Sequence, residues 1–204
     1  MRAAALVLAA ALAAILVGCS SGSSSSSSSA SSAALPSAGG SGFEGAALPL
    51  GAPAHDFTLI DPTGRRVSLD AYRGGVTIVA FLYSTCGATC IVIAQQIRGA
   101  LDELQRPLAV LIVSAEPRAD TPAHVERFLA RVSLSGRVRY LSGSLAQLRP
   151  IWRSFRIVPA AAGRAAFNRS ASVLLLDGSG RPRVIYQLEQ LTPEALAHDV
   201  RKLL

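Results

Sequence analysis

The chain has 204 residues, of which half are hydrophobic, with three cysteines and a formal net charge of +7. The Ala-rich first segment inflates the hydrophobic count and leaves about 155 residues from Leu48 onward, enough for one domain that buries its own core without disulfide help. The positive charge comes from scattered arginines, with no basic run and no nucleic-acid motif, which argues against nucleic acid as a partner and favours attraction to an anionic membrane surface.

The first 18 residues have the pattern of a signal peptide. Arg2 supplies a positive charge, and residues 3–17 form an apolar run that is too short for a stable membrane anchor. The following Leu16-Val17-Gly18-Cys19 resembles a bacterial lipobox, in which the cysteine is diacylated and becomes the new N-terminus. We therefore expect a lipoprotein of the cell envelope that is anchored to a membrane through Cys19 and faces the periplasm. The alternative is an ordinary secretory peptide.

Residues 19–47 are predicted to be a flexible tether. The stretch from Ser20 to Gly42 is almost entirely Ser, Ala and Gly, which bury too little apolar area to offset chain entropy. About 25 such residues give an end-to-end distance of about 25 to 30 Å. A domain over residues 48–204 can then reach membrane proteins without being embedded, while the choice between inner and outer membrane stays open.

The first half of the domain begins with a predicted β-hairpin. Residues 57–60 and 66–69 are short strands on either side of Asp61-Pro62-Thr63-Gly64, a typical turn sequence. Residues 76–83 form a nearly continuous apolar run rich in β-branched side chains, which indicates a strand buried on both faces of a sheet. A helix over residues 89–105 and a second buried strand over residues 108–113 are expected to follow.

The second half continues the alternation of strands and helices. A helix is expected to start near Asp120 or Thr121, and Pro150 is expected to bend or break a later one. The further predictions are a strand at 138–141, a helix at 145–155, a hairpin of 172–176 with 183–188, and a last helix from Thr192. This order predicts an α/β fold with a mixed central sheet flanked by helices and an N-terminal β-hairpin extension.

Cys86 and Cys90 follow the predicted central strand, at the start of the next helix. Free backbone N–H groups and the helix dipole there stabilise a thiolate, which is the reactive form in disulfide exchange and the ligand form for soft metals such as Cu(I). Residues four apart on a helix lie about 5 to 6 Å apart, close enough for a disulfide or for one shared Cu(I) ion. The alternatives are a static bridge, which adds little stability across so small a loop, and two inert thiols.

The chain resembles the Sco/SenC family, whose members are thioredoxin-fold copper proteins tethered to membranes and associated with assembling the copper centre of cytochrome oxidase. The resemblance rests on Phe57-Thr58-Leu59 with Asp61 and Gly64, on residues 81–90 (FLYSTCGATC), and on residues 114–122 (SAEPRADTP). It implies a thioredoxin-like fold and copper bound by Cys86 and Cys90. It also implies a partner that is the copper-site subunit of cytochrome oxidase or another extracytoplasmic thiol protein.

One position departs from the family pattern. The family completes a Cys-Cys-His copper site with a histidine in a D-H-[ST] motif, where this chain has Asn168-Arg169-Ser170. Arg169 cannot ligate a metal, and none of His55, His124 and His198 has ligand spacing to the cysteines, so copper binding is expected to be weak or two-coordinate. A fixed positive charge on Arg169 beside the cysteines would instead stabilise a thiolate and lower a cysteine pKa.

Three functions are consistent with these observations. The leading prediction is a Sco-like factor that delivers copper to, or reduces the thiols of, a cytochrome c oxidase subunit during assembly. The alternatives are a general extracytoplasmic thiol-disulfide oxidoreductase that binds no copper, and a metal-free interaction module in which the cysteines only form a bridge. A peroxiredoxin is disfavoured, because Tyr83 and Gly87 stand where that chemistry requires threonine three residues before a cysteine.

Overall fold

The computed structural model describes residues 40–53 and 56–204, which belong to one compact unit. The predicted signal peptide, Cys19 and most of the predicted tether lie outside the described residues. Within the described part of the chain, no helix is both long enough and apolar enough to cross a membrane.

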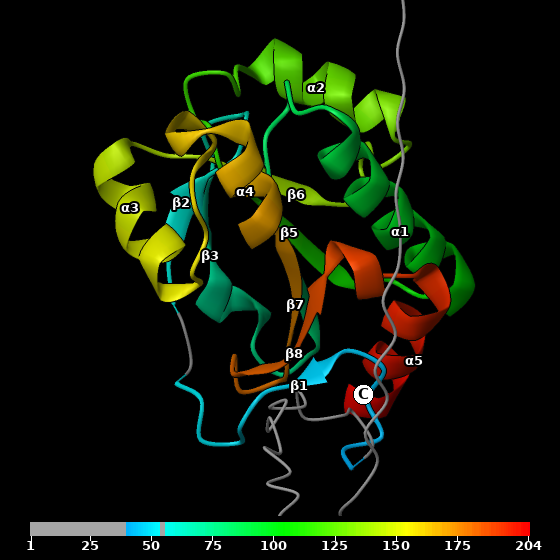
Figure 1. The fold of residues 1–204 in the computed structure, drawn as a ribbon. Coiled ribbons are helices and arrows are strands. Elements are labelled where there is room, and N and C mark those ends of the chain that lie inside the picture. Colours follow the sequence, from blue (N-terminus) through cyan, green and yellow to red (C-terminus); the bar gives the residue numbers. More distant parts are fainter. Residues whose placement is uncertain (1–39, 54–55) are drawn as a thin grey trace, which may run out of the picture. The chain divides into compact units, whose positions relative to one another are not determined.

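The domain is built on a six-stranded mixed sheet (Figure 1). Three strands in its middle and at one edge run parallel to one another, and the other three are joined through antiparallel pairs. This arrangement confirms the predicted mixed central sheet. In spatial order the strands are β1 (Ala46–Ala47), β8 (Pro182–Gln187), β7 (Ser172–Leu176), β4 (Thr77–Leu82), β5 (Ala109–Ser114) and β6 (Arg139–Leu141).

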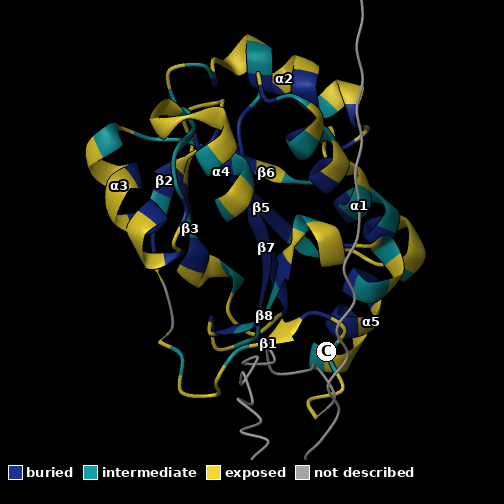
Figure 2. Ribbon diagram, viewed as in Figure 1, coloured by how far each residue is buried: buried dark blue, intermediate teal, exposed yellow. Residues whose placement is uncertain are grey.

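Helices cover both faces of the sheet, so that β4 is buried on both sides (Figure 2). Successive side chains of a strand point to opposite faces. Ile78 and Leu82 therefore join the core beneath α1, α2 and α5, whereas Val79 and Phe81 join a second core beneath α3 and the β-hairpin. The helices are α1 (Ala88–Leu104), α2 (Pro122–Arg131), α3 (Leu145–Ser154), α4 (Arg164–Ser170) and α5 (Pro193–Leu203), with short 3-10 turns η1 (Leu69–Tyr72), η2 (Ala160–Ala162) and η3 (Leu188–Gln190).

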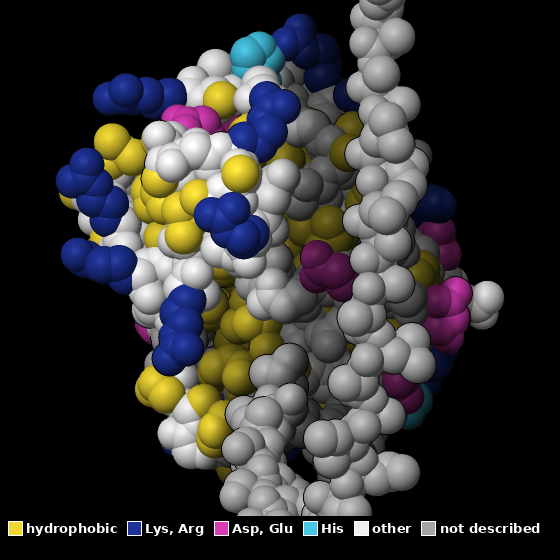
Figure 3. Space-filling view, in the orientation of Figure 1, with side chains coloured by type: hydrophobic (Ala, Val, Ile, Leu, Met, Phe, Trp, Pro, Cys, Tyr) yellow, Lys and Arg dark blue, Asp and Glu magenta, His cyan; other side chains and the backbone are white. Residues whose placement is uncertain are grey.

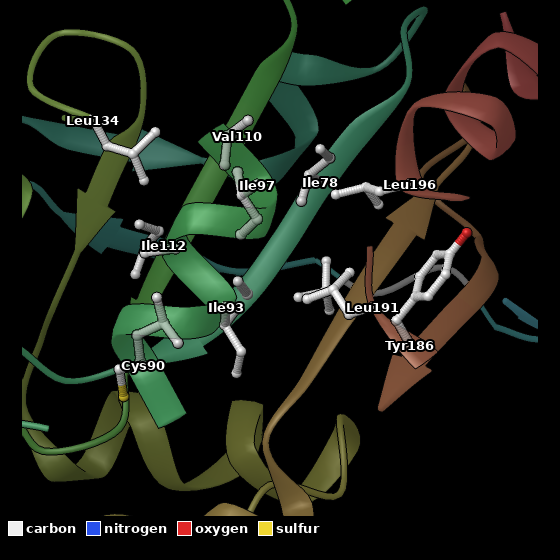
Figure 4. Close-up of a cluster of buried hydrophobic side chains, with 14 of the residues drawn as sticks. Ile78, Cys90, Ile93, Ile97, Val110, Ile112, Leu134, Tyr186, Leu191 and Leu196 are labelled. Carbon is white, nitrogen blue, oxygen red and sulfur yellow. The ribbon is translucent and has the colours of Figure 1, made fainter. Parts of the chain in front are cut away.

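Helix α1 carries the second cysteine on its buried face. Cys90, Ile93 and Ile97 are spaced so that they share one side of the helix. Figure 4 shows these three side chains facing the sheet, where Ile78 and Ile112 lie. Because α1 follows β4 and packs back onto the same sheet, its first turn is held at the carboxyl end of that strand.

The predicted N-terminal hairpin is confirmed as strands β2 (Thr58–Ile60) and β3 (Arg66–Ser68). Its turn is held by Asp61, whose Oδ1 accepts hydrogen bonds from the Thr63 hydroxyl at 2.6 Å and the Arg65 N–H at 3.1 Å. The Thr63 hydroxyl is the main cause of a lowered Asp61 pKa. The hairpin joins the main sheet's end through a bridge between Ile60 and Ser142.

Pro150 does not break α3, contrary to one of the two predicted outcomes. The helix runs from Leu145 to Ser154 with Pro150 inside it. Its start is fixed by a capping box between Ser144 and Gln147, and its apolar face packs on the second core. These interactions offset the hydrogen bond that proline cannot donate.

Contacts with the domain begin a few residues before the predicted boundary at residue 48. Strand β1 pairs with β8, and the buried carboxylate of Asp199 accepts the backbone N–H groups of Glu44 at 2.9 Å and Gly45 at 3.0 Å. Asp199 also accepts the Tyr186 hydroxyl at 2.5 Å. A Cβ on Gly45 would lie 2.5 Å from Val184 Cγ1, so only glycine allows this approach.

Candidate functional site

Cys86 and Cys90 form a disulfide, with their Cα atoms 5.7 Å apart. Cys86 lies in the loop between β4 and α1, and Cys90 lies in the first turn of α1. Cys90 is fully buried, whereas Cys86 is 7% exposed. Cys86 is therefore the more exposed cysteine of the pair, and we expect an incoming thiol to attack it first.

The start of α1 favours negative charge on the cysteine sulfurs after reduction. The helix is preceded by Gly87, which has no side chain to cap it, so the first backbone N–H groups keep no capping partner. Cys90 belongs to this first turn, where the helix dipole is positive. The structure thus confirms that the pair lies at the start of a helix, and stabilisation of a thiolate there stays a prediction.

Asp120 holds the loop that leads into Cys86. Its Oδ1 accepts the Ser84 N–H at 2.6 Å, and its Oδ2 accepts the hydroxyls of Ser114 at 2.5 Å and Tyr140 at 2.8 Å. All three parallel strands end at the same edge of the sheet, so the loops after β4 and β5 meet there beside Tyr140 of β6. The carboxylate thus ties the cysteine loop to two neighbouring strands.

Burial of Tyr140, reinforced by the negative charge of Asp120, raises the Tyr140 pKa well above its ordinary value. The hydroxyl therefore stays protonated and donates its hydrogen to the carboxylate. Sequence reasoning singled out Ser114 as part of a family-like segment, and Asp120 both there and as a possible helix start, but neither as a partner of the cysteine loop. It missed Tyr140, because a tyrosine in a short strand carries no signal of a partner 20 residues away.

The segment Asn168-Arg169-Ser170 ends helix α4, which lies close to the cysteine loop. Phe167 of α4 packs edge-on against Tyr83, with ring centroids 5.0 Å apart. Arg169 is exposed and has no hydrogen bond or ion pair to the described residues. Arg164, at the start of the same helix, lies close to Gly87 of the cysteine loop: a Cβ built on Gly87 would be 3.8 Å from the Arg164 Nη1 atom.

The histidines do not complete a metal site in the described part of the chain. His124 Nδ1 lies 2.8 Å from the Ala119 carbonyl oxygen, and His198 Nδ1 lies 2.9 Å from Asp199 Oδ1. His55 lies outside the described residues. In the ranges 40–53 and 56–204, no group of three His, Cys, Asp or Glu side chains is placed to hold a metal ion.

Copper therefore has two sulfur donors available here once the disulfide is reduced, and no third ligand among the described residues. As a disulfide, the pair offers no thiolate for Cu(I). The chemistry that this geometry supports directly is thiol-disulfide exchange at Cys86 with Cys90 as its internal partner.

Comparison with family models matches residues 49–204 to SCO1/SenC. Among solved structures, Bradyrhizobium japonicum ScoI with copper bound is similar at 25% identity and a TM-score of 0.56, with 75% of this chain and 100% of that chain covered. No match was found among curated protein sequences.

Two other structures share the fold at lower identity. BsSco, described as a Sco-family cytochrome c oxidase assembly protein with a disulfide switch, has 23% identity and a TM-score of 0.65, with 78% of this chain and 96% of that chain covered. A SCO1/SenC family lipoprotein from Bacillus anthracis has 18% identity and a TM-score of 0.63, with 76% of this chain and 96% of that chain covered. These matches confirm the predicted thioredoxin-like fold.

Proposed function

The chain belongs to the SCO1/SenC family, and on this basis we propose that it is a membrane-tethered thiol-disulfide exchange protein that prepares a copper site of cytochrome c oxidase. The observation that carries the proposal is the Cys86–Cys90 disulfide, in which Cys86 is the more exposed of two buried cysteines, with no third metal ligand among the described residues. Its substrate would be a disulfide in the copper-site subunit or in another extracytoplasmic thiol protein.

In the proposed reaction, the reduced pair transfers two electrons to the partner. The Cys86 thiolate attacks one sulfur of the partner's disulfide, and the other partner sulfur leaves as a thiolate and takes a proton from water. Cys90 then loses its proton to solvent and attacks Cys86 in the mixed disulfide. The second partner sulfur leaves as a thiolate and takes a proton from water, so the partner holds two thiols and the Cys86–Cys90 disulfide forms again. A second extracytoplasmic dithiol protein must reduce the pair before another cycle.

Copper, in this proposal, is a cargo that only the reduced pair can hold. Support comes from the copper-bound relative and from the soft character of two thiolates. With Arg169 in place of the family's histidine, binding would be two-coordinate and weak. A general oxidoreductase that binds no copper is the second candidate, and the missing third ligand among residues 40–53 and 56–204 favours it.

We further propose that residues 1–18 are removed, that Cys19 carries a lipid, and that residues 19–47 tether the domain of residues 48–204 to an envelope membrane on the periplasmic side. A lipoprotein of the same family supports this proposal. The chain with Cys19→Ser should lose both incorporation of labelled palmitate and recovery in the membrane fraction. If the variant keeps its membrane fraction and its label, the tether proposal is wrong.

An anaerobic Cu(I) titration against a competing chelator tests the role of copper. The full-length reduced protein is compared with its Arg169→His variant and with a Cys86→Ser control that has lost one sulfur. Weak binding that the histidine variant strengthens would support thiol exchange as the main activity. Tight one-to-one binding by the parent would show instead that two thiolates suffice and that copper delivery is the main function.

The redox potential separates a working disulfide from a static one. Structural disulfides in secreted proteins have potentials below about −300 mV, whereas catalytic ones are more oxidising. We expect the Cys86–Cys90 pair to equilibrate with glutathione buffers at a potential above that limit. A pair that stays oxidised in all of these buffers, in a protein that binds no copper, would leave the metal-free interaction module as the function.

A further inference from the structure

A basic pocket of about 340 Å³ lies beside the cysteine loop. Two of its lining residues, Ser84 and Thr85, directly precede Cys86 in the chain. The others come from α2, and the complete lining is Ser84, Thr85, His124, Arg127, Phe128 and Arg131. The pocket therefore lies beside the segment that leads directly into Cys86.

The two arginines of this pocket carry positive charge that nothing in the described residues neutralises. Arg127 and Arg131 are exposed, and neither forms an ion pair with an acidic side chain in the described ranges. They stand four residues apart on α2, a spacing at which like charges destabilise a helix. The helix dipole favours Arg131 in the last turn of α2, but no ion pair offsets the repulsion between the two arginines.

The acidic groups nearby do not cancel this charge. Asp120 sits behind Ser84, but it is buried and already accepts three hydrogen bonds. Glu126 of α2 lines a different pocket, with Pro122 and Leu129. Figure 3 shows basic side chains over α2 and α4 and also along the edge where α3 lies, with most acidic ones near α1 and α5.

We propose that this pocket binds an acidic side chain of the thiol protein that reacts with Cys86. A carboxylate next to the partner's cysteine would enter between Arg127 and Arg131 and accept their N–H groups, which brings the partner's sulfur to Cys86. Arg164, near Gly87 on the other side of the loop, adds a further positive charge. The inference rests on the proposed thiol exchange and specifies its substrates as proteins with acidic residues around the reactive cysteine.

Two synthetic peptides test the inference on the full-length oxidised protein. One is Ac-Asp-Asp-Gly-Cys-Gly-Asp-Asp-NH2, and the other has Asn in place of each Asp. The rate of reduction of the Cys86–Cys90 disulfide is divided by each peptide's thiolate concentration. At low salt the acidic peptide should react about five- to tenfold faster, and the ratio should approach one in 0.5 M salt, because exposed charges are then screened.

The matched variants locate the source of this ratio. Arg127→Glu with Arg131→Glu should reduce the ratio to one or below. Arg149→Glu with Arg153→Glu changes the net charge equally, at two exposed arginines with the same spacing on α3, and should leave the ratio as in the parent. A ratio that survives in the α2 variant, or falls equally in both variants, overturns the pocket as the docking site.

The remaining outcomes distinguish this inference from the proposed function. Equal rates for both peptides on the parent overturn the acidic docking site but leave thiol exchange intact. Failure of both peptides to reduce the disulfide contradicts thiol exchange itself. Binding to phosphatidylglycerol vesicles that only the α2 variant loses, with the peptide ratio unchanged, would assign the pocket to a membrane surface and overturn the proposal.

Discussion

Removal of the Asp120 carboxylate should have two effects: the cysteine loop loosens, and the domain loses stability. In Asp120→Ala, the buried Ser114 hydroxyl loses its acceptor, while the Ser84 N–H, which is only half-buried, regains water. The Tyr140 hydroxyl keeps the Leu82 carbonyl oxygen, 3.4 Å away, as a poorer acceptor. With about 1 to 3 kcal/mol for each buried donor left without a partner, the expected loss is about 3 kcal/mol.

Urea unfolding of the oxidised protein at pH 7 measures this loss. Asp120→Asn keeps one oxygen for the Ser84 N–H, and the hydroxyls of Ser114 and Tyr140 can turn to accept from its amide. Its loss should therefore be about 1 kcal/mol. The control is Asp102→Ala, which removes an exposed carboxylate paired with two arginines and should cost less than about 1 kcal/mol.

The same variants should change the reactivity of the disulfide. Dithiothreitol should reduce Cys86–Cys90 severalfold faster in Asp120→Ala than in the parent, because the loop that shields Cys86 has lost its attachment. If Asp120→Ala costs no more stability than Asp102→Ala and leaves the reduction rate unchanged, then Asp120 does not hold the loop and the reasoning from these hydrogen bonds is refuted.

Three further results are expected. Above about pH 10 the free energy of unfolding should fall, because burial raises the Tyr140 pKa in the folded state, so that tyrosine ionises first in the unfolded chain. Tyr140→Phe should flatten this decline in urea unfolding measured over a series of pH values. An unchanged slope would show that Tyr140 is not the group responsible. The Cys86–Cys90 bridge closes a loop with a sequence separation of 4, and its reduction should lower the free energy of unfolding by about 2 kcal/mol. Equal stability with and without dithiothreitol would show that the bridge does not constrain the unfolded chain. Gly45→Ala should cost about 1 to 3 kcal/mol in thermal unfolding, since its methyl group would lie 2.5 Å from Val184, and a Glu44→Ala control with a similar loss would refute the steric explanation.

Much of the fold could be predicted because its signals are local. A continuous run of β-branched residues marks β4, the Thr121-Pro122 pair marks the start of α2, and Thr192-Pro193 marks the start of α5. Strand β1 has no such signal, since two alanines lack any hydrophobic pattern. It forms because the neighbouring backbone is held by Asp199 at the other end of the chain.

The spacing of Cys86 and Cys90 at the start of a helix predicted that their sulfurs lie close enough for a disulfide or a shared Cu(I) ion, and the structure joins them in a disulfide. The surroundings of the pair depend on contacts between distant segments. Ser84 and Asp120 are 36 residues apart and meet because parallel strands end at one edge of the sheet. The positively charged side chain that lies near Gly87 of this loop is Arg164, which the sequence analysis did not single out. The role of Arg169 in stabilising a thiolate stays a prediction.

The order of the elements and the position of Cys86 and Cys90 at the start of a helix follow from the amino-acid sequence alone, since each depends on neighbours in the chain. The surroundings of Cys86 follow only from the tertiary structure: the Asp120 attachment, the basic pocket of α2 and the approach of Arg164. The physical reason is that short-range interactions fix helices, turns and caps residue by residue. The position of one loop against another is instead set by how strands and helices pack around the two cores.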